Sequence, residues 1–202
     1  MKFVNSKRLR SWLRELGWFA VIIIGVLAAR SSLADHYYVP SGSMQHSLYA
    51  GDRVVVDKRA YGLRLPFTLM TITSGAAVQR GDVVIFDSPR DGKRLIKRIV
   101  ATGGDTAAII DGHLIINGHS MGVPGGALLE DFNGKLVSIN LDGGGGPDFV
   151  ATVPEGKLLA IGDNRGNSLD GRIFGFVDEA EIYGKALAVY YRKGEGPAWI
   201  RL

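Results

Sequence analysis

The chain has 202 residues and a formal net charge of +4, which is enough for one domain of ordinary size and a short appendage. It contains no cysteine, so disulfide frameworks, thiol catalysis and cysteine zinc sites are excluded. Apolar residues make up 46% and charged residues 22% of the chain, close to globular averages, which excludes wholesale disorder.

The excess positive charge lies at the amino terminus. Residues 1–16 contain five basic residues and one acidic residue, whereas the rest of the chain holds 19 of each sign. A nucleic-acid surface needs basic residues clustered on the folded domain, so we expect no nucleic-acid partner. A basic cluster ahead of an apolar run is typical of the cytoplasmic flank of a membrane segment.

An apolar run follows at residues 17–29 and ends at Arg30. As a helix these 13 residues would measure about 20 Å, less than the ~30 Å hydrocarbon core, so flanking residues and snorkelling arginines have to extend the span. We expect a cytoplasmic segment at 1–16, a transmembrane anchor at 17–34 and an extracytoplasmic domain at 35–202. A cleaved secretory signal ending at Ala34 is the alternative, because the three residues before the cut would read small-x-small.

Short β-prone runs separated by turn residues follow the apolar run. They predict strands at 53–58, 82–86, 95–101, 157–161 and 185–191. Asp111-Gly112 between two apolar pairs predicts a hairpin over 107–118, and a short helix is expected near 178–183. The glycine-rich stretch at about 119–150 is expected to be an exposed, loop-rich insertion. The predicted fold class is therefore mainly β.

Few residues are candidates for chemistry. The four histidines have no metal-ligand spacing, so neither a metal site nor a cofactor is predicted. Ser43 lies in the segment Pro40-Ser41-Gly42-Ser43-Met44, and Lys97 lies in the predicted strand at 95–101. Strand alternation flanks Lys97 with apolar residues on its own face. Such a lysine either snorkels at a sheet edge or is held dry for chemistry.

Four segments together resemble, in order and spacing, the sequence boxes of bacterial type I signal peptidases. They are Ser41-Gly42-Ser43-Met44, Gly51-Asp52, Arg80-Gly81-Asp82-Val83-Val84 with Lys97-Arg98, and Gly162-Asp163-Asn164-Arg165 with Asn167-Ser168, Asp170 and Arg172. The resemblance extends from the apolar run to about Tyr191. It implies a signal-peptidase-like β catalytic domain with one N-terminal transmembrane helix, held on the outer face of the bacterial inner membrane. Such a serine endopeptidase removes signal peptides from exported preproteins after a small-x-small motif.

The resemblance also implies a role for each matching residue. Ser43 would be the nucleophile and Lys97 its general base, which requires the pKa of the amine to fall from about 10.4 to near 7 or 8. Ser168 would hydrogen-bond and orient Lys97, and Asp170 would pair with Arg172 to support that loop. The Ser41 hydroxyl and the Ser43 backbone N–H would form the oxyanion hole.

Specificity for small-x-small sequences implies two shallow apolar pockets. By resemblance, the candidate lining residues are Val39, Pro40, Met44, Leu48, Val54, Leu95 and Ile96. The implied partners are the signal peptides of preproteins and the lipid bilayer, with contact to the protein export machinery left open.

Departures from the family pattern leave alternatives. Gln45-His46-Ser47 stands where a residue followed by Pro-Thr is usual, and Gly166 and Gly171 replace the usual Asp and Ser. A specialised paralogue, such as a conjugation-type maturation peptidase, would fit these changes. His46 is an alternative base for Ser43, although no carboxylate is identified to orient it. A soluble self-cleaving Ser-Lys repressor and a secreted, non-catalytic β-domain cleaved after Ala34 are the other classes.

Overall fold

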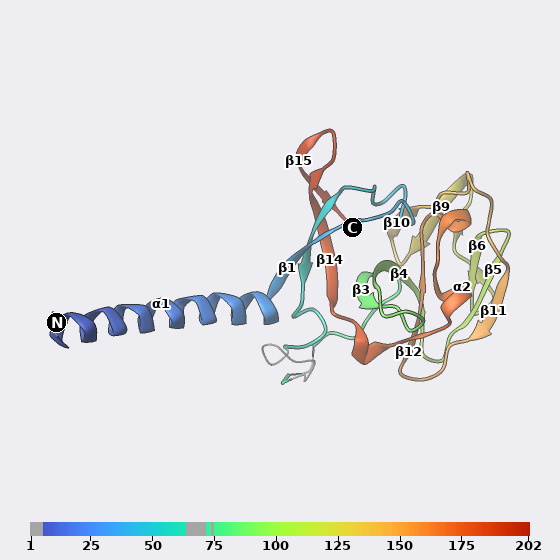
Figure 1. The fold of residues 1–202 in the computed structure, drawn as a ribbon. Helices are drawn as coiled ribbons and strands as arrows, with labels where there is room; N and C mark the ends of the chain where they lie inside the picture. Colours follow the sequence, from blue (N-terminus) through green and yellow to red (C-terminus); the bar gives the residue numbers. More distant parts are fainter. Residues whose placement is uncertain (1–5, 64–71, 74) are drawn as a thin grey trace.

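A computed structural model describes residues 6–63, 72–73 and 75–202 (Figure 1). Its helices are α1 (Ser6–Ser32) and α2 (Gly171–Phe174), with two 3-10 turns, η1 (Arg165–Asn167) and η2 (Glu179–Glu181). The strands are β1 (Ala34–Tyr38), β2 (Arg53–Asp57), β3 (Val83–Asp87), β4 (Arg94–Thr102), β5 (Thr106–Ile110), β6 (His113–Ile116), β7 (His119–Ser120), β8 (Gly122–Val123), β9 (Gly126–Phe132), β10 (Lys135–Ser138), β11 (Phe149–Thr152), β12 (Lys157–Ile161), β13 (Val177–Asp178), β14 (Gly184–Arg192) and β15 (Gly196–Arg201).

The domain is built on one large antiparallel sheet and two small ones. The large sheet has the order β1-β2-β14-β3-β4-β12-β13, and β15 pairs with β14. The small sheets have the orders β11-β5-β6-β7 and β10-β9-β8. The prediction of a mainly β fold is confirmed, and the five strands expected from apolar runs correspond to β2, β3, β4, β12 and β14.

The predicted hairpin forms between β5 and β6. Asp111 and Gly112 both have positive φ, 49° and 81°, as a type I′ turn requires. The helix expected near 178–183 is reduced to the single 3-10 turn η2.

Residues 119–150, expected as an exposed loop-rich insertion, contain β7 to β10 and the start of β11. Phe132, Val137 and Ile139 are at most 3% exposed, so this region contributes to the core. Asn133 and Gly134 adopt positive φ between β9 and β10, which is the same hairpin turn as at Asp111-Gly112. The short strands are stabilised by packing against distant strands, which no local pattern in a glycine-rich sequence indicates.

The core fixes the segment that carries Ser43. Met44 and Leu48 are fully buried and pack with Val54, Ile85 and Ile96, which lie on strands of the large sheet. Because Met44 directly follows Ser43, this packing positions the serine against the sheet.

Helix α1 extends away from the β domain, with the amino terminus at its far end (Figure 1). Its side chains from Trp12 to Leu27 are exposed. The transmembrane span expected at 17–34 falls mainly on α1, but no helix in the described part of the chain is both long and apolar enough to cross a membrane. The expected cytoplasmic segment at 1–16 begins with five residues that lie outside the described ones.

Candidate active site

Ser43 and Lys97 are in direct contact although 54 residues separate them in sequence. Lys97 lies in the middle of β4, between β3 and β12, and is only 2% exposed. Its Nζ lies 2.5 Å from Ser43 Oγ, within hydrogen-bonding distance. Lys97 is therefore buried within the sheet and does not snorkel at its edge.

Burial changes the acid–base behaviour of Lys97. Loss of solvation disfavours the ammonium form and lowers the pKa of Lys97 to about 8, while the negative charges of Asp170 and Asp163 act in the opposite direction. A minor but useful fraction of the amine, about 9% at pH 7, is thus neutral, and a neutral amine is a potential proton acceptor.

The backbone around Ser43 is held by the segment that follows β12. Asn164 donates its backbone N–H to the Ser43 carbonyl at 3.1 Å, and its side-chain amide donates to the Gly42 carbonyl at 3.2 Å. The Ser41 hydroxyl lies 3.4 Å from Ser43 Oγ. Ser41 is exposed and Ser43 is half-buried, so this pair of hydroxyls lies at the surface.

Ser168 does not make the hydrogen bond to Lys97 that the resemblance implies. Its hydroxyl is buried and has no hydrogen-bond partner in the described structure. It lies against Gly162 instead, so that a Cβ added at Gly162 would be 2.1 Å from Ser168 Oγ and 2.5 Å from the Ser43 carbonyl oxygen. Only glycine allows this close approach of the two segments. Ser168 is therefore near Ser43, but its hydroxyl is turned toward Gly162.

Asp170 and Arg172 form a fully buried ion pair at 2.9 Å. Asp170 also accepts the Gly162 N–H at 3.0 Å, which ties the pair to the glycine beside Ser43. Arg172 donates to the carbonyls of Gly145 and Arg165 at 2.7 and 2.6 Å. The pair thus joins the glycine-rich loop to the segment that contacts Ser43.

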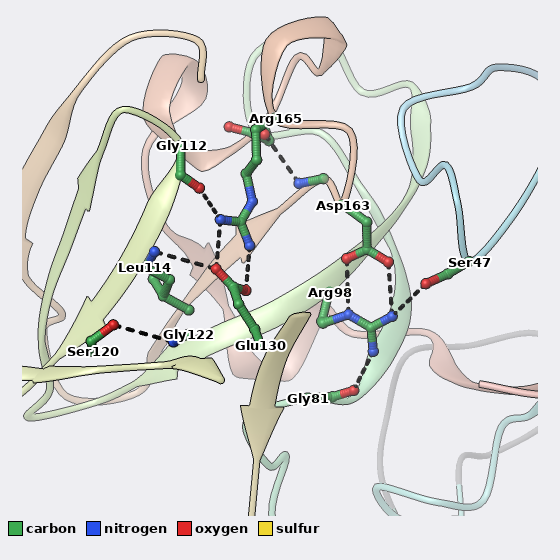
Figure 2. Close-up of polar contacts among 12 residues, drawn as sticks. Ser47, Gly81, Arg98, Gly112, Leu114, Ser120, Gly122, Glu130, Asp163 and Arg165 are labelled. Atoms are coloured by element: carbon green, nitrogen blue, oxygen red, sulfur yellow. Dashed lines mark hydrogen bonds and ion pairs between the residues drawn. The ribbon is translucent and has the colours of Figure 1, made fainter. Parts of the chain in front are cut away.

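Two further buried ion pairs surround this segment (Figure 2). Asp163 accepts two hydrogen bonds from Arg98, at 2.9 and 2.8 Å, and Glu130 accepts two from Arg165, at 2.8 and 2.5 Å. All four side chains are at most 2% exposed. No motif in the sequence pointed to Glu130, because it lies in the stretch for which no regular structure is predicted. The turn signal at Asn133-Gly134 could have revealed its strand.

A small pocket of about 30 Å³ is lined partly by residues that directly precede Ser41 and Lys97 in the chain. It is lined by Tyr37, Tyr38, Val39, Pro40, Ile85, Arg94, Leu95 and Ile96, and so brings together four of the seven residues expected to bind substrate. The other three, Met44, Leu48 and Val54, are 0% exposed in the core. They pack in one buried cluster with the pocket residues Val39, Ile85 and Ile96.

Arg94 is a pocket residue to which no sequence motif pointed. Its guanidinium makes two hydrogen bonds to Asp87, at 2.9 and 3.3 Å, and one to the Tyr37 hydroxyl at 3.1 Å. It also lies over the Tyr183 ring, 3.7 Å from its centre. Through these contacts Arg94 forms one wall of the pocket.

His46, the alternative base, is exposed and its Nδ1 lies 3.4 Å from the Tyr49 hydroxyl. Among the described residues no hydrogen bond joins it to Ser43. Among the described residues, no group of three or more His, Asp or Glu side chains could hold a metal ion.

A serine hydroxyl in contact with a buried amine is the arrangement of the Ser-Lys class of hydrolases. The family model described as signal peptidase, peptidase S26, matches residues 9–191. The chain therefore belongs to the signal peptidase family S26, whose members are serine endopeptidases.

Two sequence relatives agree with this assignment. The chain is 35% identical to signal peptidase I of Pseudomonas fluorescens, over 86% of this chain and 70% of the relative. It is 32% identical to signal peptidase I of Bacillus licheniformis, over 86% and 87% of the two chains. A crystal structure of a signal peptidase I from Enterococcus faecalis V583 matches with 33% identity and a TM-score of 0.41, covering 55% of this chain and 97% of that one.

Proposed function

We propose that this protein removes signal peptides from exported preproteins after a small-x-small motif, with Ser43 and Lys97 as its catalytic pair. The observation that carries the proposal is the 2.5 Å contact between Ser43 Oγ and the Nζ of a lysine that is 2% exposed. Such a contact provides both a nucleophile and the base that it needs.

The reaction follows from these two groups. Neutral Lys97 removes the proton of Ser43 Oγ while the oxygen attacks the scissile carbonyl carbon, which gives a tetrahedral intermediate. The C–N bond then breaks, and the Lys97 ammonium donates its proton to the leaving amine. Water, deprotonated by Lys97, hydrolyses the acyl-enzyme, and the proton returns to Ser43 as the ester bond breaks.

The developing negative charge on the carbonyl oxygen needs donors that are already in place. The Ser41 hydroxyl, 3.4 Å from Ser43 Oγ, and the Ser43 backbone N–H are our candidates. Asp170 and Arg172 act indirectly, since Asp170 holds Gly162 at 3.0 Å and Gly162 packs against the Ser43 carbonyl. In this scheme Ser168 completes the packing around Gly162.

The pocket between Val39, Pro40, Leu95 and Ile96 supports the expected specificity. A volume of about 30 Å³ is of the size of a methyl group, as a preference for small side chains requires. The substrate's small residue before the cleavage point would occupy this pocket, with Arg94 and Tyr37 closing it.

We also propose that α1 holds the domain at the inner membrane, with the amino terminus in the cytoplasm and residues 35–202 outside. Exposed apolar side chains support this, among them Trp18, Phe19 and Ile22, each at least 60% exposed. The basic residues before them favour the cytoplasmic side. Fractionation after a carbonate wash, followed by protease treatment of spheroplasts, tests both retention and orientation. Recovery of a soluble form that begins at Asp35 would contradict the anchor.

The catalytic proposal is tested with the full chain in detergent and a preprotein substrate. Wild type and His46→Ala should cut at the same position, whereas Ser43→Ala and Lys97→Ala should lose activity by more than about a hundredfold. Loss in His46→Ala together with activity in Lys97→Ala would transfer the role of base to the histidine.

A further inference from the structure

The peptide group between Gly42 and Ser43 is held at one end and free at the other. The Gly42 carbonyl oxygen accepts two hydrogen bonds, from the Gln45 backbone N–H at 3.1 Å and from the Asn164 side-chain amide at 3.2 Å. At the other end of the same peptide group is the Ser43 N–H. In the part of the chain that the structure describes, no group accepts this N–H.

The geometry of a peptide group links its two ends. In a trans peptide such as Gly42-Ser43, the C=O and N–H bonds lie in one plane and point in opposite directions. A hydrogen bond that fixes the Gly42 carbonyl therefore also fixes the direction of the Ser43 N–H. An N–H that is already aligned stabilises a developing negative charge without rearrangement during the reaction.

The Asn164 amide is itself held in one orientation. Its Nδ2 donates a second hydrogen bond to Gln45 Oε1 at 3.3 Å, so both of its N–H bonds point into the segment that carries Ser43. Asn164 is only 5% exposed, and its Oδ1 is buried with no hydrogen-bond partner in the described structure. An unmet buried acceptor costs stability, so this orientation of the amide is maintained at the expense of the fold.

The backbone of Asn164 is immobilised by its neighbours. The preceding Asp163 and the following Arg165 each belong to a buried ion pair whose side chains are at most 2% exposed (Figure 2). Asn140 bridges the same segment, since its N–H donates to the Asp163 carbonyl at 2.8 Å and its carbonyl accepts the Arg165 N–H at 3.0 Å. The Asn164 side chain therefore reaches Gly42 from a fixed point.

We propose that Asn164 is a positioning residue that aims the Ser43 N–H at the oxyanion, and that Gln45 orients Asn164 for this role. The inference rests on the proposed peptidase function. In this role both side chains act through the backbone and need no contact with the substrate. The two act in series, because the only hydrogen bond from the Gln45 side chain in the described structure goes to Asn164.

The test compares Asn164→Ala, Gln45→Met and the double variant with wild type, using the full chain in detergent and a quenched small-x-small peptide. Asn164→Ala should lower kcat about ten- to hundredfold and Gln45→Met about three- to tenfold, with little change in KM, because the oxyanion exists only in the transition state. The double variant should be no slower than Asn164→Ala alone. Gln79→Met is the matched control, since Gln79 is exposed, and should behave as wild type.

Two further measurements separate positioning from general damage to the site. The inflection of the pH profile near 8 should stay in place in all variants, because Lys97 is untouched. A small-x-small peptide aldehyde reports on the oxyanion directly: Ser43 Oγ bonds to the aldehyde carbon, Lys97 takes the hydroxyl proton, and the carbonyl oxygen becomes negative. Its Ki should rise by the factor by which kcat falls, whereas the matching peptide alcohol should bind all variants equally.

Several outcomes would overturn the proposal. They are an unchanged kcat in Asn164→Ala, a loss that lies wholly in KM, a displaced pH inflection, and additive losses in the double variant. Circular dichroism checks folding, and if Asn164→Ala is unfolded, Gln45→Met alone decides, because Gln45 is only half-buried. Activity in Ser43→Ala would instead refute the proposed function, so the two failures are distinguishable.

Discussion

Raising the pH from 6 to 10 is the most direct perturbation of the Ser43–Lys97 pair. With the pKa of Lys97 at about 8, only the neutral amine can act as base, so the active fraction follows its titration. That fraction is about 1% at pH 6, about 9% at pH 7 and about 91% at pH 9 for a single group with this pKa. The value of kcat/KM should therefore rise about tenfold per pH unit at first and level off above pH 9.

The assay is cleavage of an internally quenched peptide that carries a small-x-small site, measured across the pH range under conditions where substrate is below KM. His46→Ala is the control and should keep the same inflection, since His46 lies within hydrogen-bonding distance of Tyr49 and no hydrogen bond joins it to Ser43. An inflection near pH 6.5 that disappears in His46→Ala would refute the reasoning, and so would a rate that stays flat between pH 6 and 9.

Three further predictions test other parts of the structure. Burial lowers the pKa of Lys97 to about 8 in the folded chain, so between pH 8 and 10.5 the unfolded chain binds more protons than the folded chain. Below pH 8 Lys97 is charged in both states, and burial of its ammonium lowers the free energy of unfolding by about 3 kcal/mol. Lys97→Met should thus be inactive yet more stable to urea than wild type at pH 7, with the gain shrinking toward pH 10.5; a constant difference across this range would contradict the shift. Arg94→Ala should open the small pocket, so that the kcat/KM preference for Ala over Val before the cleavage point falls about tenfold, while the exposed Arg90→Ala keeps it. Glu130→Ala leaves Arg165 buried and unpaired, and should lower the free energy of unfolding in urea titrations by about 3–5 kcal/mol. Asp178→Ala, which removes one partner of an exposed ion pair, should lower it by less than about 1 kcal/mol. Equal losses in the two variants would argue against a buried-charge effect.

The glycine-rich region links the small sheets to the serine segment. Glu130 on β9 holds Arg165, and the backbone N–H of Arg165 donates to the Asn140 carbonyl at 3.0 Å. The adjacent Asn164 donates to the Ser43 carbonyl. An unbroken series of buried contacts therefore connects residues 119–150 with the proposed nucleophile, so this region supports the site structurally.

Local patterns in the sequence determined the parts of the fold whose cause is local. Apolar runs of strand length predicted β2, β3, β4, β12 and β14, and Asp111-Gly112 predicted the β5–β6 turn because positive φ is a property of those two residues. The order of the four boxes identified Ser43 and Lys97 as the candidates for chemistry.

Only the tertiary structure decided how these residues are surrounded. The depressed pKa of Lys97, the partner of Arg165 and the wall formed by Arg94 all depend on contacts between strands that are far apart in the chain. The same holds for the strands within 119–150 and for the hydroxyl of Ser168, which turns toward Gly162. Desolvation and side-chain pairing are properties of the assembled core, whereas turn and strand preferences belong to short stretches of the chain.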